Sequence, residues 1–264
     1  MSRLIDRKSF SIKDSGSILA FETAGSGHWA EWDRYLTIDG QRAFLIGNIC
    51  GTCEFFFERL DGVSQGVSPR EVSTALQNGV SKLDVDLVSK ASSILPEGDY
   101  EVSLLELKPK LIEPGTDEDY FTNEQVHVWG IDSFVGLPHH PKIKYYRSSE
   151  KELNSKSKLF EFVVPTFPVS WLDDDTIDKY RSLISDDRKP TALCLSVLDI
   201  KEPSDYGNHV DHPEHWCLTH YIVDGHHKVF SASLLDQSIT MLSFLAKGEG
   251  ISNDKDIEAL FRNL

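Results

Sequence analysis

A strand, a glycine turn and a helix follow one another near residue 224, and this succession constrains the fold more than any other feature of the chain. Leu218–Val223 is an unbroken apolar run typical of a buried strand. Asp224-Gly225 then provides a sharp exit, because glycine adopts backbone angles closed to other residues. A helical pattern begins at His226. We therefore expect residues 224–228 to form a strand-to-helix junction in a mixed fold.

This junction has the chemistry of a phosphate site. The first amides of a helix lack internal partners, and the helix dipole leaves about half a positive charge there. The side chains of His226, His227 and Lys228 add hydrogen-bond donors, and Asp224 can hold a metal ion or accept a proton. Gly225 lets the backbone approach a ligand closely. The alternative is a plain turn followed by two partly packed histidines.

The length of 264 residues favours two cores, or one core with a large elaboration. Between Ser148 and Lys158 the composition shifts to Ser, Glu, Lys and Asn with a single leucine, which indicates a linker. We predict an α+β protein with a β-rich N-terminal domain over residues 1–150, containing two helices, and an α/β domain over residues 159–264.

The N-terminal part carries one strong turn signal. Asp39-Gly40 separates two apolar runs, Tyr35–Ile38 and Arg42–Gly47, and both central residues of a type I′ hairpin turn need positive φ. We therefore predict a hairpin there. Other strands are expected near Phe10 and Ile12, near Leu19 and Phe21, and over 100–107 and 126–131, with helices from Ser68-Pro69-Arg70-Glu71 and over 82–94.

The C-terminal part alternates strand and helix patterns. Asp173 is a typical helix N-cap, and the last helix places Ile257, Leu260 and Phe261 on one face. Strands are expected over 160–164, 192–200, 217–223 and 239–245, with helices over 173–184 and 226–235 and a final helix ending at Leu264.

From Val164 to Leu245, roughly a third of the chain, the sequence resembles the ParB/sulfiredoxin-like superfamily. The similarity lies in Pro165–Val169 and Trp171, an apolar strand, and Tyr221-Ile-Val-Asp-Gly-His-His-Lys-Val-Phe-Ser-Ala232. Members of that superfamily bind nucleotides at this turn, so the resemblance implies a nucleotide phosphate near Gly225, His226, His227 and Lys228.

Two departures narrow what the resemblance implies. Sulfiredoxins carry a catalytic cysteine followed by His-Arg in this turn, whereas His226 stands at that position here, and an imidazole does not replace a thiolate nucleophile. Partition-type ParB proteins have paired arginines and a later helix-turn-helix domain, whereas this chain has His227-Lys228 and about twenty residues after Leu245. The chain is most similar to the superfamily's small-molecule kinases, which use a separate acidic base.

The first functional hypothesis is therefore a nucleotide-dependent enzyme, a phosphotransferase that uses ATP or another nucleotide with magnesium on a small hydroxylated molecule. Asp224, His226 and His227 would be catalytic, and Gly225, His226, His227 and Lys228 would hold phosphates. The base would be Asp173, Asp174 or Asp175, with Glu202 as a further candidate. The alternatives are a non-catalytic nucleotide- or anion-binding regulatory module whose N-terminal part contacts a partner protein, and a zinc-stabilised structural protein.

Cys50-Gly-Thr-Cys53 has the spacing that lets two thiolates bind one zinc ion. A redox dithiol and ordinary partly buried cysteines are the alternatives, and the following Phe55-Phe56-Phe57 indicates buried packing. The loop from Asn208 to Cys217 is either a metal site, a lid over the phosphate turn or a polar surface loop. Further zinc ligands are available from His139, His140, His209, His212, His215, Cys217 and His220.

Charge and hydropathy exclude several classes of protein. The net charge of -15 opposes a polyanion, and the densest basic stretch, Lys142–Arg147, is followed by Glu150 and Glu152, as in a solvated surface strand. No run approaches the roughly 18 apolar residues of a membrane span, and no signal-length apolar core follows the N-terminal charges. Four cysteines do not make a secreted disulfide framework. We expect a soluble cytoplasmic protein that binds neither nucleic acid nor membranes.

Overall fold

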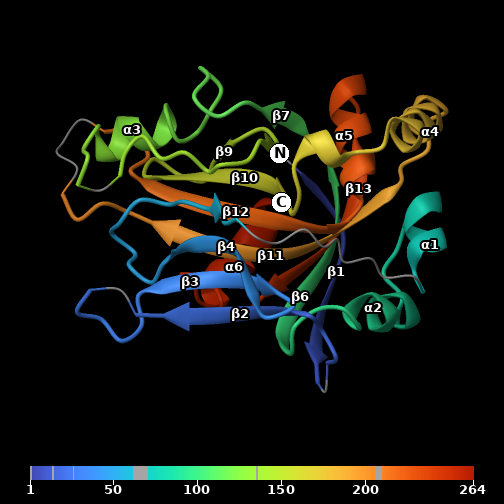
Figure 1. Ribbon diagram of the computed structural model, residues 1–264, viewed down its shortest axis with the longest axis horizontal. Helices are drawn as coiled ribbons and strands as arrows, with labels where there is room; N and C mark the ends of the chain where they lie inside the picture. Colours follow the sequence, from blue (N-terminus) through green and yellow to red (C-terminus); the bar gives the residue numbers. More distant parts are fainter. Residues whose placement is uncertain (1, 14, 26, 62–70, 135, 206–209) are drawn as a thin grey trace.

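The computed structural model describes residues 2–13, 15–25, 27–61, 71–134, 136–205 and 210–264 (Figure 1). The strands of this part of the chain form two sheets, and helices pack around them, so the chain has the predicted α+β fold. The larger sheet contains β1 (Arg3–Ile12), β6 (Gly98–Leu107), β7 (Lys110–Ile112), β8 (Tyr145–Arg147), β9 (Lys151–Glu152), β10 (Ser157–Pro165), β11 (Thr191–Lys201), β12 (Glu214–Asp224) and β13 (Ile239–Ala246).

The order across this larger sheet is β1-β6-β13-β11-β12-β10-β8-β7, with β9 also beside β10. The pairs β10–β12 and β11–β13 are parallel, and the other pairs are antiparallel. Because β6 pairs with β13, strands from both sides of residue 150 share one sheet. The smaller sheet has the order β2 (Leu19–Ala24), β3 (Asp33–Ile38), β4 (Gln41–Asn48), β5 (Glu58–Arg59).

The helices of the described residues are α1 (Ser73–Asn78), α2 (Val85–Ser92), α3 (Glu124–Trp129), α4 (Asp174–Ser185), α5 (His226–Leu235) and α6 (Asp254–Asn263), with a 3₁₀ turn at Val169–Trp171. Asp173 caps α4 as predicted, accepting a hydrogen bond from Thr176 N. We predicted a helix cap at Ser68-Pro69-Arg70-Glu71, and its first three residues lie outside the described residues. In the part of the chain that is described, no helix is both long enough and apolar enough to cross a bilayer.

The predicted hairpin is confirmed. Asp39 and Gly40 join β3 to β4 with φ of 52° and 71°, the two positive values that the type I′ turn requires. The strand predicted over 126–131 is wrong, because these residues begin within α3. The buried side chains there are Gln125 and Val128, three positions apart as on one helix face, and Gly130 with φ 77° follows the helix.

The polar segment between Ser148 and Lys158 is part of the large sheet and not an unstructured linker. β9 pairs with β10 through Glu152 and Lys151. Asn154 turns the chain between them, because its Oδ1 accepts hydrogen bonds from the amides of Lys156 and Ser157 at 2.8 and 3.1 Å. Local side-chain-to-backbone bonds thus help to order a segment that has a single apolar residue, Leu153.

The basic stretch at 142–147 is half buried. Tyr145 and Tyr146 lie inside the sheet, in β8. Lys142 and Lys144 are exposed, and they pair with Glu58 and Glu113 respectively. Each of these two exposed lysines therefore has a carboxylate partner.

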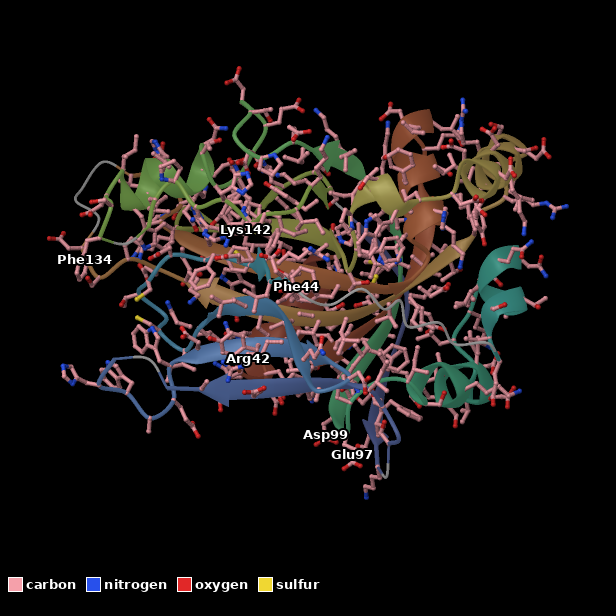
Figure 2. All side chains as sticks on the ribbon, in the orientation of Figure 1. Arg42, Phe44, Glu97, Asp99, Phe134 and Lys142 are labelled. Carbon is pink, nitrogen blue, oxygen red and sulfur yellow. The ribbon has the colours of Figure 1, made fainter. Side chains whose placement is uncertain are left out.

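The two faces of the large sheet carry different layers. On one face, α5 and α6 pack against different parts of the sheet: Val229 of α5 shares one apolar cluster with Ile222, and Leu260 of α6 shares another with Leu218. The other face packs against the small sheet, α1 and α2. Phe44 of β4, labelled in Figure 2, lies in this second interface with its ring 5.4 Å from that of Tyr221 in β12. Phe55 and Phe57 are buried there too, as predicted.

A row of four buried polar side chains crosses the large sheet on its helical face. Ser243, Ser196, His220 and Glu161 come from β13, β11, β12 and β10, and we call them the polar row. Ser196 Oγ lies 2.8 Å from Ser243 Oγ and 2.7 Å from His220 Nδ1, and His220 Nε2 lies 3.4 Å from Glu161 Oε1. Burial alone would raise the pKa of Glu161, but hydrogen bonds, the largest from His220, lower it to about 2.

A buried ion pair joins the two sheets. Arg34 of β3 donates to both carboxylate oxygens of Asp199 in β11, at 3.0 and 2.7 Å. The guanidinium also donates to the carbonyl oxygens of Glu249 and Ile46, at 2.7 and 3.3 Å. Ile251 N donates to Asp199 Oδ1 at 2.8 Å. Both charged groups therefore have hydrogen-bond partners in addition to one another.

Candidate functional site

The predicted junction is present at the end of β12. Gly225 has φ 106° and ψ 21°, and α5 begins at the next residue. A Cβ at position 225 would lie 2.9 Å from Cα of Ala192 in β11, closer than real contacts allow. The turn therefore requires glycine for two reasons, the left-handed backbone and the contact with β11.

This double requirement gives a stability prediction. Gly225→Ala is expected to lower the free energy of unfolding by roughly 2 to 4 kcal/mol, from strain at positive φ and from the clash with Ala192. Gly115→Ala is the matched control, because Gly115 also has positive φ but nothing lies within 4 Å of its Cβ position. Urea unfolding of both variants measures the difference, and equal losses would show that the contact with Ala192 adds nothing.

His226 faces the protein interior. Its Nε2 accepts a hydrogen bond from Thr166 N at 3.0 Å and lies 2.9 Å from Thr166 Oγ1. Its ring stacks on Phe167 with 3.8 Å between ring centres. Burial lowers the pKa of His226 to about 3, and an Nε2 that accepts from a main-chain amide carries no proton. His226 is thus a neutral side chain that attaches α5 to the end of β10.

Lys228 and Asp224 are also engaged within the junction. Lys228 Nζ donates to Thr191 O at 2.9 Å and to Asp224 Oδ2 at 2.8 Å. Burial lowers the pKa of Lys228, and the Asp224 carboxylate opposes this shift. These contacts give the ammonium group a structural role between β11 and β12, which differs from the predicted role on a phosphate.

His227 lies in the first turn of α5, and its side chain is only partly buried. Its Nε2 accepts a hydrogen bond from Asp173 N, the residue that caps α4, at 2.9 Å. The proton of the neutral ring is therefore on Nδ1, for which the described contacts include no acceptor. Burial lowers the pKa of His227, whereas the carboxylates of Asp173 and Asp224 raise it.

Two helix N-termini meet at this imidazole. α4 and α5 pack against one another at the same end of the large sheet (Figure 1), and Ser231 Oγ of α5 donates to Ile177 O of α4 at 3.0 Å. The hydrogen bond from Asp173 N to His227 joins their first turns. The first amides of each helix lack partners within the helix and carry partial positive charge, and only Thr176 N of α4 has a side-chain acceptor, Asp173, among the described contacts. Together the two helix starts favour an anion.

Stacked aromatic rings lead from the junction to the surface. Phe167 stacks on buried His226, and its ring centre lies 6.2 Å from that of Trp171 with 17° between the planes. Trp171 is 48% exposed, and the guanidinium of Arg59 lies 5.8 Å from the centre of its ring. Sequence reasoning did not single out Arg59 or Phe167. The only signal was the position of Trp171 just before the cap of α4.

The acidic base candidates separate into two groups. Asp173 caps α4 and donates from its amide to His227, and Asp174 and Asp175 are exposed in the first turn of this helix. Glu202 follows β11 at the end opposite Thr191. Eleven strand residues span roughly 33 Å, so Glu202 cannot act as a base at this junction.

Cys50 and Cys53 lie in the loop after β4, and their side chains hydrogen-bond to one another. Among the described residues, no three His, Cys, Asp or Glu side chains gather closely enough to hold a metal ion. Asn208 and His209 lie outside the described residues. The other predicted zinc partners have contacts of their own: His139 with Phe57 O, His140 with Lys142 N, His212 with Glu152, His215 with Tyr120, Cys217 with Tyr120, and His220 in the polar row.

The structure thus brings the predicted phosphate-binding residues to one end of the sheet and buries two of their side chains, those of His226 and Lys228. The hydrogen bond from Asp173 N to His227 Nε2 holds the starts of α4 and α5 together. No protein-family model, curated protein or solved structure matches this chain.

Proposed function

We propose that this chain binds a nucleotide, with its phosphates at the joined N-termini of α4 and α5 and its base on the ring of Trp171. The observation that carries the proposal is the hydrogen bond from Asp173 N to His227 Nε2, which brings two helix starts together beside an exposed aromatic ring. Helix N-termini bind phosphate through their unpaired amides and dipoles.

The aromatic side of the site suits a base. The ring of Trp171 is partly exposed, and the ring of Phe167 lies nearly parallel to it. Stacking of a base on an aromatic side chain contributes about 1 to 3 kcal/mol and tolerates every base, because each has a π face. The guanidinium of Arg59 beside the ring provides a positive charge.

The carboxylates at the start of α4 predict that the nucleotide binds with magnesium. Asp173, Asp174 and Asp175 would repel a bare polyphosphate. Magnesium is commonly held by one or two carboxylates together with substrate phosphates, which turns this repulsion into attraction. The ligand would then be the magnesium complex of a nucleoside di- or triphosphate.

The contacts favour binding over phosphoryl transfer. Asp224, proposed for metal or proton transfer, pairs with Lys228, and His226 is buried against Thr166. A regulatory nucleotide-binding module is therefore our first proposal. The phosphotransferase is the second, supported by the exposed carboxylates of Asp174 and Asp175 beside the site.

Trp171→Ala is expected to weaken nucleotide binding about tenfold or more, because it removes the stacking surface. Trp29→Ala is the matched control, since Trp29 is also exposed but lies in the loop before β3. Calorimetric titration with ATP, ADP, CTP and GTP, with magnesium and with a chelator, measures both variants. We expect heat with magnesium and little without it.

The same titrations can end the proposal. No heat with any of the four nucleotides in the presence of magnesium would reject it, as would equal affinities for the Trp171 and Trp29 variants. A doubly substituted Asp174→Asn, Asp175→Asn chain separates the two functions. A binding module forms no phosphorylated product in any variant, whereas a phosphotransferase forms product as the unsubstituted chain and loses it in this variant.

A further inference from the structure

The loop Cys50–Cys53 holds two partly exposed thiols in contact with one another, although the nucleotide site does not use them. Cys50 Sγ lies 3.2 Å from Thr52 Oγ1. The Cys53 thiol donates a hydrogen bond to Cys50 Sγ. Both cysteines are free. The other two cysteines, Cys194 and Cys217, are fully buried in β11 and β12.

The end of the large sheet fixes the position of this loop. Lys201, the last residue of β11, has no exposed surface and donates from Nζ to Cys50 O at 2.6 Å. The next residue, Glu202, donates from its amide to Gly51 O at 3.0 Å. A buried ammonium group is thus held beside the two thiols by the main chain, and its charge favours a thiolate.

Two further contacts restrain the remaining residues of the loop. Cys50 N donates to Asn48 Oδ1 at 3.0 Å, and Trp129 Nε1 of α3 donates to Thr52 O at 3.2 Å. Main-chain groups of three consecutive residues, 50 to 52, therefore have fixed partners, which keeps the two sulfur atoms together without a bond between them.

The two thiols are not equivalent. Burial raises the pKa of Cys50, but hydrogen bonds from Cys53 and Thr52 outweigh burial, and the net shift is downward. For Cys53, burial and the neighbouring Cys50 both raise the pKa, to about 12. One partly exposed sulfur atom is thus favoured as a thiolate, and its neighbour is kept as a thiol.

We propose that Cys50 and Cys53 form a redox-active dithiol that exchanges with disulfides of small molecules or proteins. The Cys50 thiolate attacks one sulfur of the disulfide, forms a mixed disulfide and releases the first thiolate. Cys53 then attacks Cys50, passes its proton to a departing thiolate, and releases the second. The chain loses two electrons and the Cys53 proton, and the disulfide becomes one thiol and one thiolate, which takes its proton from the solvent.

This site is independent of the nucleotide site. Lys201 and Thr191 are the two ends of β11, roughly 33 Å apart along an extended strand. The first contacts the cysteine loop, and the second contacts Lys228 of the glycine turn. Loss of one activity therefore leaves the other to be measured in the same preparation.

The test uses the whole chain and oxidised glutathione as the probe, with peptide mass mapping. In the unsubstituted chain we expect an internal Cys50–Cys53 disulfide that excess reduced glutathione reverses. Cys53→Ser should instead accumulate one glutathionyl group on Cys50. Cys50→Ser should react at least about tenfold more slowly, because Cys53 is mostly a thiol. Cys194 and Cys217 should stay unmodified, as internal controls.

Thr52→Val tests the hydrogen bond without removing either thiol. Thr52 is exposed, so the substitution should leave the fold intact, and circular dichroism checks this for every variant. We expect the pH midpoint of the Cys50 reaction to move upward, because a donor to the thiolate is lost. Unchanged rates in Cys50→Ser, or no mixed disulfide in Cys53→Ser, would overturn the proposal. An equivalent of tightly bound zinc that shields both thiols would overturn it as well.

Discussion

Arg34→Met is expected to lower the free energy of unfolding by roughly 3 to 5 kcal/mol, because it leaves Asp199 buried without its counter-ion. The two oxygens of Asp199 accept two hydrogen bonds from the guanidinium, and both side chains are almost completely buried between the sheets. Methionine fills a similar volume but donates no hydrogen bond. The carbonyl oxygens of Glu249 and Ile46 would also lose a donor.

Arg42→Met is the matched control on the neighbouring strand. Arg42, labelled in Figure 2, pairs with Glu22 and lies over the ring of Tyr35, but both charged groups are exposed. Exposed ion pairs contribute about 0 to 1 kcal/mol, so the control should change stability little. Urea unfolding compares the two variants. Similar losses for both would mean that the buried pair does not hold the sheets together.

The free energy of unfolding should also fall by several kcal/mol as the pH is lowered from 6.5 toward 4. His226 has a pKa of about 3 in the folded chain, below the ordinary value of 6.5. Between these two pH values the unfolded chain binds a proton that the folded chain does not bind. The free energy of unfolding is therefore highest above pH 6.5 and falls as the pH is lowered toward 3. At about 1.4 kcal/mol per pH unit, this imidazole alone accounts for roughly 3 kcal/mol by pH 4.

Other buried groups add to this dependence. Burial lowers the pKa of His215 to about 3 as well, so it acts in the same range and direction. Glu161 has a pKa of about 2 in the folded chain, below the ordinary glutamate pKa of 4.5. Its contribution to the free energy of unfolding is complete above pH 4.5 and is lost as the pH falls from 4.5 toward 2. Acid destabilisation that begins near pH 6 thus reports on the histidines, and Glu161 contributes at lower pH.

Urea midpoints measured at a series of pH values test the role of His226. His226→Gln removes the titrating ring, so the variant is less stable at pH 7 but should lose less stability between pH 6.5 and 4. The control is His140→Gln, which makes the same replacement at an exposed histidine. The attribution to His226 is wrong if its Gln variant keeps the slope of the unsubstituted chain.

Local sequence signals predicted the elements that hold the site. Asp39-Gly40, the cap Asp173 and the Gly225 turn are all where the sequence indicates, because each follows from the backbone requirements of a few adjacent residues. The direction of the side chains in α5 was not predictable in this way. Its buried residues include His226, Lys228 and Val229, so polar and apolar residues share the inner side and periodicity is uninformative.

Local sequence signals could not predict contacts between residues that are far apart in the sequence. Arg34 and Asp199 are 165 positions apart, and nothing near either residue indicates the other. The pairing of β6 with β13 is equally remote, so composition around residue 150 could not reveal that one sheet runs across it. The stacking of Trp171 on Phe167 needed the turn at Pro168, which the sequence did not specify.

The polar row limits the ways in which the large sheet can assemble. If β11 slipped by one residue, Ser196 would move to the opposite face, and His220 would lose a hydrogen-bond partner inside an apolar layer. Such misaligned sheets are disfavoured even though they bury as much apolar surface. An all-aliphatic replacement of the row could therefore match the natural chain in thermodynamic stability and still refold with a lower yield, because nothing would penalise the wrong alignments.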